Sequence, residues 1–157
     1  MSSREVVENI YAYWGAQDVE LTTALFHEGI VYKLHVVSAD LPFGGVWRGR
    51  EACRDTMFSI LQEFDYLRYE PTIVSVRGNV VRAQIRFAYQ HRRTGGILEG
   101  TRRLVFRVRG NRIVRIDGYH DAQLVEAFMR LTKFRLASDQ LVNSPALPKR
   151  EKQGSSN

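Results

Sequence analysis

Arg102 is a cation on an otherwise apolar strand face. It shares the alternating parity of Leu104 and Phe106, and alternate residues of a strand face the same side. A guanidinium buried there needs an anion, a ligand or water, because a buried unpaired charge is costly. A register shift or bulge would instead turn Arg102 outward, and Arg103 beside it shows how small a shift suffices. Facing inward, Arg102 would bind or polarise an anionic oxygen.

His120 is the second candidate for chemistry. It follows Val114, Ile116 and Gly118 on the inward parity of the last expected strand. An imidazole with a pKa of about 6.5 exchanges protons near neutral pH and suits general acid or base catalysis. The alternative is a histidine that only makes hydrogen bonds within the core.

The first expected strand contains Tyr32, whose phenol is the third candidate for chemistry. Ile30, Tyr32 and Leu34 share one face, while the competing parity presents Lys33 and His35 instead. On the first of these faces, Tyr32 would donate a hydrogen bond to a ligand. The candidate catalytic residues are therefore His120, Arg102 and Tyr32.

A small-molecule site would need a wall around these groups. Aromatic and small residues of the strands and of the first helix supply it, although the helix aromatics would serve equally well as plain core residues. The candidate substrate-binding residues are Tyr11, Trp14, Phe87, Phe106 and Gly118. A mostly apolar cavity with a few convergent polar groups is the usual form of such a site.

Three helices are expected before the main sheet. Ser2 and Glu5 have the spacing of a capping box, which predicts a helix from Ser2. Asp18 would cap a short second helix through Phe26. Gly49 begins a third helix with an apolar stripe at helical spacing, formed by Cys53, Met57, Ile60, Leu61 and Phe64. The stripe indicates core packing, with Cys53 as a small buried hydrophobe.

The remaining elements are strands and a final helix. A strand is expected over 29–37, followed by a loop over 38–48. Gly-rich turns separate four further strands, at about 67–77, 80–92, 97–109 and 112–120. Strands of that length predict a twisted, curved antiparallel meander with helices on its concave side. A last helix would run to about Ala137, and the polar composition of 138–157 predicts a disordered tail.

Composition limits the function classes. The 157 residues, 44% hydrophobic and 25% charged, predict one globular domain. A single Cys excludes an internal disulfide and a thiolate cluster, and four His without paired spacing predict neither a metal site nor a cofactor. The chain also lacks a run long enough for a membrane helix, so we expect no membrane partner and a cytoplasmic location.

The charge of +6 comes with arginines spread along the strands. Such a face could attract phosphates. The alternative is a solvated outer face, and we favour it over nucleic-acid binding because the strands lack the aromatic–basic interleaving of a stacking platform.

Three stretches, in this order, resemble the nuclear transport factor 2-like superfamily, in its SnoaL-like and ketosteroid isomerase-like branch. They are Gly15-Ala16-Gln17-Asp18, Gly45-Val46-Trp47-Arg48-Gly49-Arg50-Glu51-Ala52, and Gly110-Asn111-Arg112-Ile113 leading to Tyr119-His120-Asp121. The resemblance covers 4–137 and implies a domain over 1–137. It implies an α+β fold in which a curved antiparallel sheet wraps around the N-terminal helices as a cone-shaped α+β barrel, with a C-terminal helix. It also implies a metal-free site and a homodimer formed through the sheet.

The catalytic residues of that branch do not carry over. SnoaL-like cyclases and limonene epoxide hydrolase-like enzymes keep an acid–base Asp five positions after the Ile of the final turn, and here that position is Gly118. The ketosteroid isomerase-like base would fall near Lys33 or Leu34, and its oxyanion-hole acid around Arg102 or Arg103. The resemblance thus implies a protein that binds a small hydrophobic molecule. It would be either a metal-free isomerase, cyclase or lyase using acid–base chemistry, or a non-catalytic ligand-binding or dimerisation module.

Overall fold

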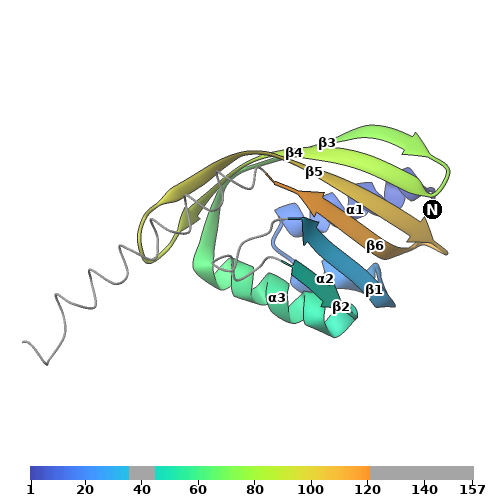
Figure 1. Cartoon of the computed structure of the whole chain (residues 1–157), viewed down its shortest axis with the longest axis horizontal. Helices are drawn as coiled ribbons and strands as arrows, with labels where there is room; N and C mark the ends of the chain where they lie inside the picture. Colours follow the sequence, from blue (N-terminus) through green and yellow to red (C-terminus); the bar gives the residue numbers. More distant parts are fainter. Residues whose placement is uncertain (36–44, 121–157) are drawn as a thin grey trace, which may run out of the picture.

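The computed structural model describes residues 1–35 and 45–120 and has an α+β fold (Figure 1). The expected C-terminal helix, the tail over 138–157 and most of the 38–48 loop lie outside these residues. The elements in chain order are α1 (Ser3–Gly15), α2 (Val19–Ala24), β1 (Phe26–His35), β2 (Gly45–Arg48), α3 (Arg50–Glu63), β3 (Phe64–Arg77), β4 (Val80–His91), β5 (Ile97–Arg109) and β6 (Arg112–Tyr119).

The six described strands form one sheet in the order β2-β1-β6-β5-β4-β3. Strands β3 to β6 are the expected antiparallel meander. Strand β1 adds to β6 in parallel, and β2 is antiparallel to β1. The sheet curves around the helices, as Figure 1 shows, but stays open, with β2 and β3 at its two edges.

The helix ends follow the sequence signals. Ser2 N donates to Glu5 Oε1 at 2.8 Å, and Glu5 N donates to Ser2 Oγ at 3.2 Å, which completes the capping box. Leu21 N donates to the Asp18 carboxylate at 2.9 Å at the start of α2. Gly49 is the N-cap of α3 with φ 92°, a backbone angle that favours glycine.

The core lies between the concave face of the sheet and the helices. On β4 the expected inward set is buried, namely Val81, Ala83, Ile85, Phe87 and Tyr89. Val6, Val7 and Ile10 of α1 pack in the same cluster. On β6 a register shift against β5 places Ile113 in the core as well as Ile116.

Several elements differ from the expectation. Helix α2 ends at Ala24 and Phe26 begins β1, although the sequence predicts a helix through Phe26. Gly45–Arg48, expected in a loop, forms β2 because Trp47 pairs with Tyr32 on the edge of β1, a contact that local sequence does not specify. Helix α3 ends at Glu63, so Phe64 begins β3 while remaining buried. None of the described helices has both the length and the apolar character of a membrane span.

Candidate functional site

A cavity lies between the concave face of the sheet and the helices. Its volume of about 120 Å³ is close to the roughly 150 Å³ of an apolar cavity that binds benzene. Aromatic rings dominate the wall, which is lined by Ile10, Tyr11, Trp14, Thr22, Phe26, Tyr32, Leu34, Trp47, Cys53, Thr56, Met57, Ile60, Phe64, Tyr66, Tyr69, Tyr89, Leu98, Arg102, Leu104, Phe106, Ile116 and His120.

Arg102 and His120 both line this cavity. Arg103 is paired with Tyr119 and Leu104 with Gly118 between β5 and β6. Arg102 directly precedes Arg103 on β5, and His120 directly follows Tyr119, where β6 ends. The inward orientation of Arg102 is the one that strand alternation favours.

The Arg102 guanidinium has no anion beside it among the described residues. Its Nε is buried and makes no hydrogen bond there. Burial acts to lower the pKa of Arg102, but the surrounding phenols, Tyr89 foremost, outweigh that effect and leave the pKa raised. The side chain is therefore a permanent positive charge in an aromatic cavity.

A row of tyrosines surrounds that charge. The rings of Tyr66 and Tyr89 stack with centroids 4.3 Å apart, Tyr69 stacks on Tyr66 at 5.8 Å, and Tyr11 meets Tyr69 edge-on at 6.2 Å. Burial raises the pKa of each of these phenols, so all are neutral hydrogen-bond donors at pH 7.

Two of these hydroxyls lack a partner. Tyr11 Oη and Tyr89 Oη are buried and make no hydrogen bond to another described residue. The Tyr66 hydroxyl interacts with that of Tyr89, but not with the geometry of a full hydrogen bond. The cavity therefore presents two unsatisfied phenols near one unpaired cation.

His120 is neutral at pH 7. Burial lowers its pKa to about 3, and the Arg102 charge adds to that effect. This differs from the ordinary value of about 6.5 indicated by sequence alone. The imidazole meets the Phe87 ring edge-on, with centroids 5.5 Å apart. It is a weak base that accepts hydrogen bonds.

Most of the expected site residues meet at this cavity, but two do not. Tyr32, Tyr11, Trp14 and Phe106 line it, whereas Phe87 and Gly118 are absent from the lining. Phe87 packs beside Tyr89 and behind His120. A Cβ on Gly118 would meet Leu104 Cδ2 at 3.1 Å and Leu34 Cδ1 at 3.2 Å, so two leucines fill that space.

Sequence reasoning missed three of the cavity tyrosines as site residues. Tyr89 carried a signal, because its parity on β4 is inward. Tyr66 and Tyr69 lie three residues apart, and a regular strand would send them to opposite faces. An irregularity in the pairing of β3 with β4, between Tyr66 and Arg68, brings both to the cavity.

The competing parity of β1 points away from the cavity. His35 Nε2 lies 2.8 Å from Asp117 Oδ1, and the His35 ring stacks on Tyr119 at 4.4 Å. Arg115 Nε donates to Asp117 Oδ2 at 2.9 Å. The Arg115 hydrogen bond lowers the pKa of Asp117 and the His35 contact adds to it, although partial burial opposes both. The side chains of His35, Asp117, Arg115 and Tyr119 thus form a cluster outside the cavity, in which they contact one another.

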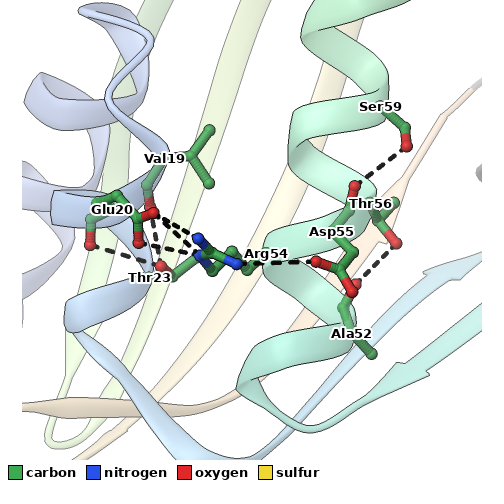
Figure 2. A network of polar contacts seen from close by, with 8 residues as sticks. All are labelled: Val19, Glu20, Thr23, Ala52, Arg54, Asp55, Thr56 and Ser59. Carbon is green, nitrogen blue, oxygen red and sulfur yellow. Dashed lines mark hydrogen bonds and ion pairs between the residues drawn. The ribbon is translucent and has the colours of Figure 1, made fainter.

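Helix α3 forms the opposite wall and is tied to α2 by Arg54. Its Nη2 lies 2.6 Å from Glu20 Oε2, and its Nε donates to Glu20 Oε1 at 3.0 Å, as Figure 2 shows. The bridge holds the face of α3 that carries Cys53 and Met57 toward the cavity. Burial raises the pKa of Cys53 to about 11, which keeps it a thiol. Within 1–35 and 45–120, no three His, Cys, Asp or Glu side chains gather to hold a metal ion.

Several solved structures have this fold. One is a nuclear transport factor 2-like protein from Burkholderia thailandensis, 24% identical, with a TM-score of 0.72 over 82% of this chain and 98% of that one. A Bacillus subtilis protein provisionally described as an isomerase is 22% identical, with a TM-score of 0.70 over 82% and 92%. A Xanthomonas campestris protein provisionally described as a polyketide cyclase is 17% identical, with a TM-score of 0.65 over 81% and 96%.

No curated protein matches the sequence significantly. The SnoaL-like domain family matches residues 7–116, from α1 to β6. That span is more than half of the chain and contains the cavity, apart from His120. The chain belongs to the SnoaL-like domain family.

Proposed function

We propose that the chain binds a small hydrophobic molecule in this cavity and acts on it by acid–base chemistry, as an isomerase, cyclase or lyase. The observation that carries the proposal is that Arg102, on β5, and His120, directly after the end of β6, both line one aromatic cavity. The provisional description of similar folds as an isomerase and a polyketide cyclase agrees with this reaction class.

Each polar group has a role in such a reaction. His120 accepts a proton from the ligand, Arg102 stabilises the oxyanion that develops, and Tyr32 donates a hydrogen bond to the same oxygen or a neighbouring one. His120 is a weak base, since burial and, as the smaller cause, the Arg102 charge lower its pKa. Negative charge developing next to Arg102 offsets the cation and strengthens the base as the proton moves.

The test is turnover of a panel of enolisable ketones and β-keto esters. Turnover is measured as the rate of proton–deuterium exchange at the carbon that loses its proton. His120→Gln and Arg102→Met should each lower the exchange rate about 100-fold or more. Arg103→Met, which changes an exposed arginine on the opposite face, should leave it unchanged. Full activity in both cavity variants would contradict the assignment of His120 and Arg102 as catalytic residues.

The alternative is a module that binds a ligand without turning it over. It is favoured by Gly118, where related enzymes carry a carboxylate and where two leucines leave no room for one. A bound ligand recovered chemically unchanged, with affinity insensitive to His120→Gln, would support this alternative over the enzyme.

A homodimer through the outer face of the sheet is a further part of the proposal. That face is basic, with Arg107 directly opposite Arg115 in the register. Two such faces repel one another, so a dimer formed there should strengthen as salt screens the charges. Sedimentation at 50 and 500 mM salt measures this, and a dimer that weakens with salt would place the contact elsewhere.

A further inference from the structure

We infer that the molecule bound in the cavity is a small carboxylic acid with about one ring, whose carboxylate pairs with Arg102 and whose hydrocarbon part lies against the tyrosine rings. This inference rests on the proposed function, in that the cavity must bind a small molecule. It adds the charge, size and shape of that molecule.

The charge of the cavity is the first argument. Among the described residues, its lining contains Arg102 and no Asp or Glu. His120, Cys53 and the four phenols with raised pKa (Tyr11, Tyr66, Tyr69 and Tyr89) are uncharged at pH 7. One positive charge is therefore uncompensated in the part of the cavity wall that the structure describes. A ligand with one negative charge would neutralise it, whereas a phosphate dianion would leave excess negative charge in an apolar space.

The orphaned polar atoms are the second argument. Arg102 Nε, Tyr11 Oη and Tyr89 Oη are buried without partners among the described residues. A guanidinium can only donate, and a phenol can donate as well. A carboxylate offers two oxygens with about four acceptor sites in a plane, and arginine commonly binds it through two parallel hydrogen bonds. One such group can satisfy the guanidinium and a phenol together.

The size and the wall of the cavity are the third argument. Its volume of about 120 Å³ is close to the roughly 150 Å³ of an apolar cavity that binds benzene, so the ligand has the size of a single ring with a short acid group. Stacked Tyr66 and Tyr89 offer flat apolar surfaces next to Arg102. A planar or aromatic acid fits these surfaces best.

The probes are benzoate, phenylacetate and trans-cinnamate, each matched with its neutral methyl ester. Both tryptophans of the chain, Trp14 and Trp47, line the cavity, so intrinsic fluorescence reports its occupancy. Calorimetry on the full chain gives the dissociation constants. We expect at least one acid to bind about 10- to 100-fold more tightly than its ester, because hydrogen bonds to charged groups contribute more than neutral ones.

Variants of Arg102 test whether this residue causes the tighter binding of the acid. Arg102→Met should remove the preference for the acid, by lowering the affinity for the acid to about that for the ester. Arg102→Lys should keep part of the preference, because the charge remains but the planar fork is lost. Arg103→Met is the matched control and should bind the acid as the parent does. Circular dichroism checks folding, and if Arg102→Met does not fold, Arg102→Lys and Tyr11→Phe carry the test.

The outcomes separate this inference from the proposed function. Equal binding of acids and esters, insensitive to Arg102, overturns the carboxylate assignment while the binding function stands. If neither the acids nor the esters change the fluorescence or give a heat of binding, the carboxylate assignment and the proposed binding function are both overturned.

Discussion

Leu104 Cδ2 lies 3.1 Å from the point where a Cβ on Gly118 would be. Leu34 approaches the same point from the neighbouring strand, with its Cδ1 at 3.2 Å. Both distances are too short for an ordinary carbon–carbon contact. The position at which related enzymes carry a carboxylate is thus closed by two leucines that pack over the glycine.

Substitution of Gly118 should therefore destabilise the protein for steric reasons. Gly118→Ala should lower the free energy of unfolding by about 1–3 kcal/mol, the usual cost of overpacking a core, and Gly118→Asp should lower it further because the added carboxylate is buried. Urea unfolding measures both. Gly29→Ala is the control, since its Cβ would meet only His27, at 3.5 Å. A Gly118→Ala variant as stable as this control would contradict the packing described.

Removal of the Tyr11 hydroxyl should separate stability from binding. Tyr11 Oη is buried without a partner among the described residues, so Tyr11→Phe removes an unsatisfied group. The free energy of unfolding should be unchanged or higher, by up to about 1–3 kcal/mol, while affinity for a carboxylic acid falls about 3- to 10-fold. Thermal unfolding and calorimetry measure the two effects. Tyr13→Phe is the control, and a less stable Tyr11→Phe variant would show that the hydroxyl is satisfied.

The low pKa of His120 should make stability depend on pH. The pKa is lowered from 6.5 to about 3, so the unfolded chain binds more protons than the folded one between these values. This contribution is fully present above pH 6.5 and is lost as the pH falls toward 3. His120→Gln should show a smaller loss of stability than the parent between pH 7 and 4, measured by urea unfolding. His27→Gln, which changes an exposed histidine, should retain the parent slope.

A bound acid should raise the pKa of His120. The Arg102 charge is one of the two causes of its low value, and a carboxylate at Arg102 would neutralise that charge. NMR titration of the imidazole with and without saturating benzoate or cinnamate checks this. A pKa that stays fixed while the acid binds would place the carboxylate away from Arg102.

Much of this site follows from strand alternation. Strand β5 runs without irregularity against β4, so Arg102 keeps the inward parity that it shares with Leu104 and Phe106. The sequence alone leaves open an outward Arg102, a Lys33 and His35 face on β1, and a core role for His120. The inward positions depend only on the two-residue period of a strand and on correctly located turns.

The remaining features depend on tertiary contacts. An irregularity of β3 brings Tyr66 and Tyr69 to one face, and no local signal in the sequence marks it. The pKa of His120 depends on how deeply its ring is buried, beside Phe87. The closure of the Gly118 position depends on leucines from two other strands. Alternation predicts which way a side chain points but not what surrounds it.

The parallel pairing of β1 with β6 also determines the order of assembly. Tyr32 on β1 pairs with Ile116 on β6, and all of α3 and β3 to β5 lie between them in the chain. During synthesis β1 and β2 can therefore pair only with each other among the described strands until β6 has emerged. Contacts this distant in sequence form slowly, and the exposed strand edges invite aggregation in the meantime. The cavity, which needs side chains from both ends of the chain, is completed only when that final strand joins.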